Sequence, residues 1–392
     1  MANPQVMLGF PREVSGLAVI RSLVRRGKRL AAYDSDAGSA GLHSGDVTDR
    51  YVWPDPAEEP SAFVDALLAA APEHEKPVLV DLEGVALEAI MQRLDEVRES
   101  YRLLVPDPGV IEIAQDKART AEFFSSNNLG APRSLVIDSL HDLQQWTGGF
   151  PAVLKPRRGK GGRGQFKLSD DSAAIAAWEE LAPGPGEYMI QEWIPGPVAN
   201  LVTVGVLADA SSEIMAQFSA QRLEVVQTPH IPEGPSAWVR STYNEAWLDV
   251  AREFVSKSGW QGMAELEFKI DERDGALRIL EINPRMWAWV DLPIRCGVDF
   301  PHLYCDLAEG KPVVPALTFP SDVHYLRIVL YSYTQFFRLF ARRQGIAEFL
   351  RRLVAPFGVL LAPGKRLVLE DIGLRREYWH WFRFYLKNTD LS

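Results

Sequence analysis

Cysteine is scarce in this chain of 392 residues. The two cysteines, Cys296 and Cys305, fit neither a disulfide framework nor the paired-cysteine spacing of a zinc site. The seven histidines are scattered, and no two of them have the spacing of metal ligands. The sequence therefore argues against a small disulfide-bonded domain and against a zinc enzyme.

Long apolar stretches are also missing. No uncharged apolar run reaches the roughly 18 residues that a membrane-spanning helix needs. The first residues, "MANPQVMLGF", lack the basic and apolar regions of a signal peptide. We therefore expect a cytoplasmic protein. Its length predicts two or three domains, and the 47% hydrophobic content supplies enough material for their cores.

Charge is distributed unevenly. The net charge is −10, yet residues 321–392 carry 12 Lys and Arg against 6 Asp and Glu, together with 14 aromatic residues. The acidic remainder argues against a nucleic-acid-binding protein. Segments 333–358 and 376–386, where arginines alternate with aromatic residues, are predicted to be helices. They favour either a cap packed on the body of the protein or a membrane-peripheral element.

Residues 5–105 alternate strand-like and helical segments. The pattern predicts strands at 5–10, 29–34, 77–82 and 101–105, and helices at 13–26, 61–71 and 85–100. Such alternation indicates a small parallel α/β sheet. The first strand-to-helix turn, "GFPREVSG", lacks the G-x-G-x-x-G fingerprint, which argues against a nicotinamide-dependent oxidoreductase.

From about residue 114 the pattern changes to mixed strands and helices. Helices are predicted at 115–130 and 244–259, and strands at 150–156, 187–196, 200–209, 213–223, 262–270 and 277–283. The proline-rich stretch 224–242 predicts a long loop of the kind that often covers a functional site.

Polar side chains recur at every second position near the end of the last predicted strand. Glu281, Asn283 and Arg285 therefore share one face of an extended chain, as do Glu265 and Glu267 on the preceding strand. The turn "DERDG" predicts that the two strands pair as a hairpin. Two carboxylates and an amide oxygen on one sheet face predict a Mg²⁺ site. The alternative is a pair of surface strands with solvated charges.

A glycine-rich loop follows the apolar strand that ends at Lys155. The loop "RRGKGGRG" contains Gly159, Gly161, Gly162 and Gly164 among basic residues. Glycines let backbone N–H groups approach an anion closely, and the cations neutralise its charge. The loop therefore predicts phosphate binding, although a solvated basic turn would have the same composition.

Five motifs occur in a fixed order along the chain. They are "DK" at 116–117, "LKPRRGKGGRG" at 154–164, "QEWIPGP" at 191–197, "GMAELEFKID" at 262–271 and "EINPRMW" at 281–287. Together they resemble the ATP-grasp superfamily, above all its carboxylate–amine ligase branch, over roughly residues 5–315.

The resemblance implies a mixed α/β and α+β fold. An N-terminal Rossmann-like pre-ATP-grasp domain (1–113) would precede a small lobe with the glycine-rich loop (114–190) and a large lobe with the Mg²⁺ site (191–320). The basic, aromatic-rich residues 321–392 would form a helical C-terminal extension that the resemblance does not cover.

The resemblance also implies the site residues. Those expected to bind ATP are Lys117, Lys155, Gly159, Gly161, Gly162, Gly164, Gln191, Glu192, Trp193 and Ile194. The lysines would hold the phosphates, and the hinge 191–194 would contact the adenine through its backbone. The implied metal ligands are Glu267, Glu281 and Asn283, for one Mg²⁺ ion or two, with Mn²⁺ as a substitute.

Two arginines are expected to act in catalysis. The resemblance places Arg285 against the transferred phosphoryl group and the intermediate. Relatives often have a lysine where this chain has Arg222, and arginine keeps the charge but cannot donate a proton at neutral pH. We expect Arg222 to bind a carboxylate or phosphate bidentately. The alternative is an ion pair between Arg222 and Glu224.

The implied activity is that of an ADP-forming ligase, which phosphorylates a carboxylate and joins the acyl phosphate to an amine. The alternatives are a small-molecule kinase on the same fold and a non-catalytic ATP-binding module. A biotin-dependent carboxylase shares the fold, but no biotin-carrier segment is evident. The expected partners are a small carboxylate and an amine, amino acids among them. Their identity and the oligomeric state, for which a dimer is one option, stay open.

Overall fold

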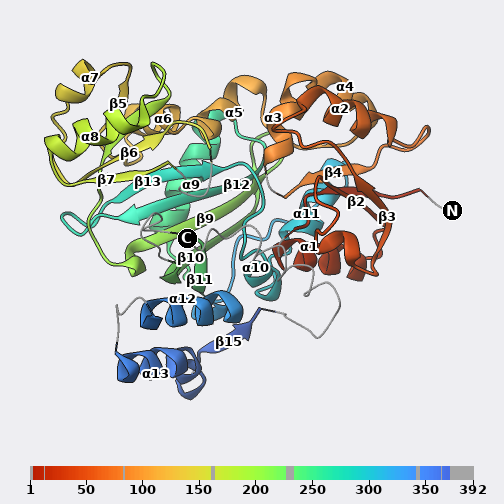
Figure 1. Cartoon of the computed structure of the whole chain (residues 1–392). Coiled ribbons are helices and arrows are strands. Elements are labelled where there is room, and N and C mark those ends of the chain that lie inside the picture. The colour runs from red at the N-terminus through yellow and green to blue at the C-terminus, as the bar shows by residue number, and fades with distance from the viewer. Residues whose placement is uncertain are drawn as a thin grey trace.

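The computed structural model of the chain describes most of its residues. They are residues 3–12, 14–82, 84–159, 164–226, 234–340, 345–362 and 364–370. These residues form three β-sheets with helices packed on them, which confirms the expected mixed α/β architecture (Figure 1).

The N-terminal domain is built on a parallel sheet. Its strands are β1 (Val6–Gly9), β2 (Leu30–Asp34), β3 (Val47–Val52) and β4 (Val78–Asp81), in the order β3-β2-β1-β4. Its helices are α1 (Val14–Arg25), α2 (Pro60–Ala69), α3 (Val85–Gln92) and α4 (Leu94–Ser100). Val6 and Leu8 enter one apolar core and Met7 enters another, because successive strand side chains point to opposite faces. Both faces of the sheet are therefore covered (Figure 1).

Two segments of this domain differ from the sequence prediction. The strand predicted at 101–105 is absent from the described residues; only Arg102 forms a bridge, with Val78. Strand β3 was not predicted. It lies at the edge of the sheet, where Thr48 and Arg50 are exposed, so it lacks the continuous apolar run of the buried strands.

The small lobe is an antiparallel sheet with helices beside it. Its strands are β5 (Ser134–Ile137), β6 (Ala152–Pro156), β7 (Phe166–Leu168) and β8 (Tyr188–Glu192), in the order β5-β8-β6-β7. Its helices are α5 (Pro108–Gln115), α6 (Lys117–Ser126), α7 (Leu140–Gln144) and α8 (Asp171–Leu181). The Asp116 carboxylate caps α6 by accepting from the Ala118 N–H at 2.9 Å and also pairs with Arg157 after β6. The start of α6 is thus tied to the lobe's central strand.

The large lobe is a long sheet that the C-terminal extension continues. Its strands are β9 (Leu201–Ala208), β10 (Ile214–Val225), β11 (Ser236–Ser241), β12 (Gly262–Ile270) and β13 (Leu277–Asn283), and its helices are α9 (Glu245–Ser258), α10 (Asp291–Arg295) and α11 (Phe300–Ala308). Strands β12 and β13 pair antiparallel, which confirms the predicted hairpin. Phe268 of β12 packs towards Phe124 of α6, so α6 covers the sheet face opposite Glu267.

The loop predicted at 224–242 is wrong in part. Strand β11 occupies 236–241 and pairs with β10, whereas residues 227–233 lie outside the described part of the chain. The sequence of β11, "SAWVRS", contains Ser at both ends and an Arg. Because of these polar residues the segment lacks a clear strand pattern in the sequence, although its alternate side chains are buried.

The C-terminal extension contains strands as well as the expected helices. Its elements are β14 (Val323–Leu326), α12 (Ile328–Phe340), α13 (Ile346–Val354) and β15 (Arg366–Leu369). Strand β14 pairs with β11 and β15, so the extension is part of the large sheet, and the order is β13-β12-β9-β10-β11-β14-β15. Helices α12 and α13 lie at the lower edge of the molecule in Figure 1. The helix predicted at 376–386 lies outside the described residues.

None of the helices in the described ranges combines the length and apolar character needed to cross a membrane.

Candidate active site

The polar ends of β12 and β13 form one face of the large sheet. The register places Glu265 opposite Asn283 and Glu267 opposite Glu281. The Asn283 amide nitrogen donates to Glu265 at 3.2 Å and to Glu267 at 3.0 Å. The carboxylates and the amide predicted from alternation therefore lie side by side. Glu265, which the sequence analysis placed on this face but not among the site residues, is part of the same cluster.

Two arginines balance this acidic cluster. Arg222 of β10 is buried and forms an ion pair with Glu267. Arg285 donates to the Asn283 side-chain oxygen at 3.2 Å and to the Met286 carbonyl at 2.9 Å. Burial and the charge of Glu267 raise the pKa of Glu265 above its usual range, because two neighbouring buried carboxylates repel each other when both are ionised.

The ion pair of Arg222 tests the alternative considered for it, a pair with Glu224. Its partner is Glu267, and Glu224 pairs instead with Arg338 at 2.7 Å and Arg352 at 3.4 Å, so the Arg222–Glu224 alternative is wrong. Arg222 Nε is buried and has no hydrogen-bond partner among the described residues. Such a donor is costly to leave unsatisfied, which suits a ligand oxygen at this position.

The donor set of this face fits a magnesium ion in chemistry. Glu267, Glu281 and Asn283 supply the carboxylate and amide oxygens that Mg²⁺ prefers. In the described residues, however, no group of three or more His, Cys, Asp or Glu side chains is arranged to hold a metal. Instead, the Glu267 carboxylate pairs with Arg222 and accepts a hydrogen bond from the Asn283 nitrogen. Metal binding would therefore require these side chains to exchange partners.

Two lysines reach the same region from the small lobe. Lys155 of β6 is buried and donates to the Gln191 side chain at 2.8 Å. Lys117, in the first turn of α6, donates to the Gly159 carbonyl at 2.7 Å and lies 4.0 Å from Glu281. Burial, and then the charge of Lys117, lower the pKa of Lys155 to about 7. The lysines and the acidic face of β13 thus meet between the two lobes.

The glycine-rich loop is described only at its ends. Gly159 has a φ of +105° with open space at its missing side chain, whereas a Cβ on Gly164 would lie 2.9 Å from the Tyr188 hydroxyl. Gly161 and Gly162 lie outside the described residues. Gly164 therefore has a packing reason to be glycine, and Gly159 has a conformational one.

The hinge residues are anchored by their side chains. Gln191 holds Lys155, Glu192 accepts from the Arg133 backbone N–H at 2.9 Å, and Ile194 is buried. The Trp193 ring lies 4.1 Å below Lys167 Nζ and 4.9 Å from Lys269 Nζ. The N–H groups of Glu192 and Trp193 donate to Arg133 and Pro151 carbonyls, so these two N–H groups are engaged within the small lobe. The predicted adenine contact would fall on the remaining backbone groups of 191–194.

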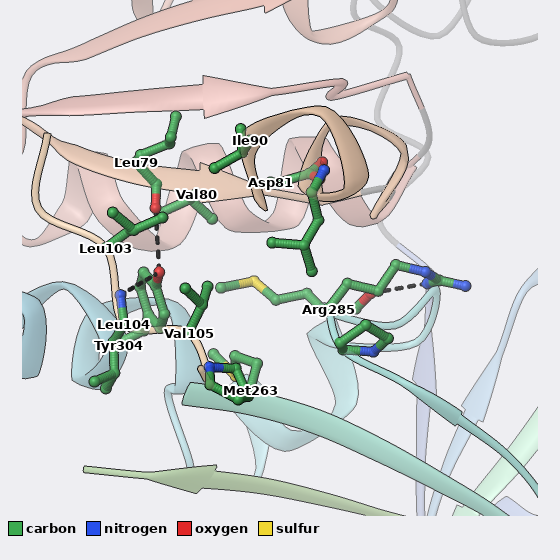
Figure 2. Close-up of a pocket in the computed structure, with 14 residues that line it drawn as sticks. Leu79, Val80, Asp81, Ile90, Leu103, Leu104, Val105, Met263, Arg285 and Tyr304 are labelled. Carbon is green, nitrogen blue, oxygen red and sulfur yellow. Dashed lines mark hydrogen bonds between the residues drawn. The ribbon is translucent and has the colours of Figure 1, made fainter. Parts of the chain in front are cut away.

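A cavity adjoins Arg285 between the N-terminal domain and the large lobe (Figure 2). Asp81 at the end of β4 and Arg285 after β13 both line it, and Leu103–Pro106 pass along its wall. The sequence analysis assigned a role to Arg285 but not to residues 103–106, because an apolar linker such as this one carries no chemical signature of its own.

Similarity to known proteins agrees with this arrangement. A family model described as "ATP-grasp domain" matches residues 114–288. A D-alanine–D-alanine ligase of Pseudomonas putida is 25% identical over 203 residues, which cover 49% of this chain and 62% of that relative. A D-aspartate ligase of Enterococcus faecium is 25% identical over 301 residues, or 71% of this chain and 70% of that protein. The match thus spans slightly less than two thirds of the length of the ligase from P. putida.

A solved structure extends the likeness of fold beyond the matched domain. The biotin carboxylase of Campylobacter jejuni superposes with a TM-score of 0.66 at 16% identity, covering 82% of this chain and 74% of that protein. The family match, the fold and the five ordered motifs lead to one conclusion. Residues 114–288 form an ATP-grasp domain, and much of the chain shares the fold of the biotin carboxylase.

Proposed function

We propose that this protein is an ATP-dependent ligase that activates a carboxylate as an acyl phosphate and joins it to an amine, releasing ADP and phosphate. The observation that carries the proposal is the meeting of Lys117 and Lys155 with the acidic face of β13, with Arg285 beside it. The relatives include a D-alanine–D-alanine ligase and a D-aspartate ligase, whose similarity covers 49% and 71% of this chain.

ATP would bind between the lobes. Lys117 and Lys155 would hold its phosphates, with Gly159 next to Lys117 and the hinge Gln191–Ile194 beside the adenine. Glu267, Glu281 and Asn283 would hold Mg²⁺, which supplies positive charge next to the phosphates; Mn²⁺ can be tested as a substitute. Phosphoryl transfer asks a protein chiefly for positioning and charge neutralisation, and these residues provide both.

The arginines would act on the reacting carboxylate. An oxygen of the substrate carboxylate attacks the γ-phosphorus, and ADP leaves with the electron pair of the broken bond. The amine then attacks the acyl carbon, phosphate leaves, and the amine loses a proton. Arg285 and Arg222 would bind the anionic oxygens that gain charge in these steps, which lowers the barrier in a site shielded from water.

Substitution of Glu281 tests the proposal. Glu281→Gln removes one charge from the metal face at little steric cost, and we expect phosphate release to fall by a factor of about 100 or more. The Glu281 side chain is 30% exposed, so the melting temperature should be almost unchanged. The measurement is phosphate release from ATP with pools of carboxylic acids and amines.

The matched control is Glu272→Gln in the exposed β12–β13 turn, which should leave turnover unchanged. Near-normal turnover by Glu281→Gln at ordinary Mg²⁺ concentrations would contradict the metal assignment. ADP formation without free phosphate, leaving a phosphorylated product, would identify a kinase.

We also propose that the extension contacts an anionic membrane surface. Ile346, Leu350 and Val354 recur every four residues on α13 and are 54–70% exposed, so they form one apolar face. Arg351, Lys365 and Arg366 are exposed nearby in the chain, and residues 321–392 carry a net charge of +6. Apolar side chains flanked by basic ones are typical of helices that lie in the membrane interface.

A further inference from the structure

The cavity beside Arg285 is small and its wall is mostly apolar. Its volume is about 40 Å³. A water molecule needs roughly 10–15 Å³ of such space, so the cavity can hold a group of only a few heavy atoms. Figure 2 shows Leu79, Ile90, Val105 and Met263 around it. These side chains come from the N-terminal domain, the linker and β12.

The polar groups of the lining have distinct positions. The Tyr304 hydroxyl donates to the Leu79 carbonyl at 3.2 Å and accepts from the Leu104 N–H at 3.1 Å, so both bonds are directed to backbone (Figure 2). Among the described residues of the lining, the ionic groups are Asp81 and Arg285. The cavity thus combines an apolar wall with one carboxylate and one guanidinium.

The ionic groups belong to different domains that meet here. Asp81 ends β4, and its carboxylate accepts from the Leu87 N–H at 3.1 Å. A Cβ on Gly84, three residues later, would lie 3.3 Å from Arg285 Cδ. The loop after β4 therefore touches the arginine that we assign to the reacting carboxylate.

The wall formed by β12 is held in place by backbone contact. A Cβ on Gly262 would lie 2.1 Å from the Leu104 carbonyl oxygen, so the linker and the start of β12 approach as closely as glycine allows. Met263, the next residue, is 7% exposed and lines the cavity. Its side chain therefore limits the size of the cavity from a fixed position.

From this arrangement we infer that the carboxylate substrate is an α-amino acid with a small apolar side chain. The inference rests on the proposed ligase function. The substrate carboxylate would face Arg285, its ammonium group would face Asp81, and its side chain would fill the cavity bounded by Met263. An acidic side chain would be buried without a partner, so this chain should differ in selectivity from its D-aspartate ligase relative.

The test is a panel of acyl donors at saturating ATP with a pool of amines. It contains both enantiomers of alanine, 2-aminobutyrate, leucine and aspartate, and propionate, which lacks the ammonium group. We expect kcat/KM for alanine or 2-aminobutyrate to exceed that for aspartate and propionate by about 100-fold or more. Release with aspartate or leucine as the preferred donor would overturn the inference and leave the ligase function standing.

Two variants connect the selectivity to the cavity. Met263→Ala should raise the kcat/KM ratio of leucine to alanine by about tenfold or more, because one or two methylene groups in a pocket change selectivity by that amount. Asp81→Asn should reduce the preference for alanine over propionate. Met215→Ala, on β10 outside the cavity, is the matched control and should change neither ratio. Unchanged ratios in the cavity variants would overturn the assignment.

A binding measurement separates this inference from the ligase proposal. If no acid and amine support phosphate release, the proposed function fails. Calorimetric titration of the full chain with alanine, leucine and aspartate in the presence of ADP and Mg²⁺ then tests whether the cavity binds a small apolar side chain. Preferential binding of alanine that Met263→Ala shifts towards leucine would support the inference, and equal or absent binding of the three would overturn it.

Discussion

Lys155 shows how one buried residue can prepare a site for an anion. Its ammonium group lies between the Gln191 oxygen at 2.8 Å and the Leu280 carbonyl at 3.5 Å, with almost no access to water. Burial and Lys117 lower its pKa to about 7. A polyphosphate placed beside it would favour the charged form and reverse that shift. Nucleotide binding should therefore be linked to protonation of Lys155.

We predict proton uptake on nucleotide binding above neutral pH. At pH 8 a lysine with a pKa near 7 is mostly neutral, so binding that restores the charge takes up close to one proton, about 0.9. Lys155→Arg stays charged throughout and should bind without this uptake. The measurement is calorimetric titration with Mg²⁺ and ADP in buffers of different ionisation enthalpy. An exposed-site control, Lys257→Arg, should behave like the wild type. Equal uptake by Lys155→Arg and the wild type would contradict the prediction.

The limits of sequence analysis are clearest for Glu265 and Arg222. Alternation along β12 placed Glu265 and Glu267 on one face, but the turn alone does not set their partners on β13, because a bulge between Glu267 and Phe268 shifts the register. The sequence could not show which carboxylate pairs with Arg222, because β10 and β12 are 40 or so residues apart in sequence and separated by β9 in the sheet. That contact depends on the direction in which long side chains reach across the sheet face, and no local sequence pattern encodes this direction.

At the scale of elements, the hairpin β12–β13 could be predicted from the sequence, whereas the strands of the extension could not. Alternating residues and a short turn made β12 and β13 predictable. Strands β14 and β15 are only four residues each and pair through contacts distant in sequence, so the sequence predicts only helices for this extension. Apolar residues of α12, including Leu330 and Tyr331, pack beside Ala237 of β11, and this packing joins the extension to the large lobe.

We predict that one buried ion pair stabilises this junction. Arg327, after β14, donates to Glu370, after β15, at 2.9 Å, and both side chains are at most 3% exposed. Glu370→Gln removes the carboxylate charge from this buried ion pair, and breaking a buried pair typically costs about 3–5 kcal/mol. We expect faster amide hydrogen exchange in β14 and β15 and a lower melting temperature. The exposed-pair control Glu96→Gln should change neither. Unchanged exchange in Glu370→Gln would show that the pair does not hold the strands.

For the whole molecule, exposed apolar surface is concentrated in one region. Of the twelve large apolar side chains that are exposed among the described residues, eight lie between Phe336 and Leu369. Few large apolar side chains are therefore exposed on the rest of the described residues. Arg338 and Arg352 bind Glu224 at the end of β10, so part of the basic charge of the extension serves docking, as the cap hypothesis expects. The outer face of α13 is not explained by that docking.

We predict that this outer face binds anionic membranes. Each basic residue near an anionic surface contributes about 1 kcal/mol, and burial of Leu350 and Ile346 in the interface adds an apolar term. The full chain should float with liposomes that contain phosphatidylserine and not with neutral ones, and binding should weaken as salt rises because the charges are screened. Leu350→Glu should reduce flotation strongly. Val314→Glu, at a position that is 85% exposed outside the extension, is the matched control and should float like the wild type.

The outcome also decides what covers α13. Removal of residues 321–392 is an unsuitable test, because β14 and β15 continue the large sheet and their loss would expose β11. Point variants of the outer face avoid this difficulty. If the wild type ignores anionic liposomes even at low ionic strength, the membrane proposal is wrong. If, in addition, Leu350→Glu lowers the melting temperature of the free protein, the face is covered by the protein itself, and the extension is a cap alone.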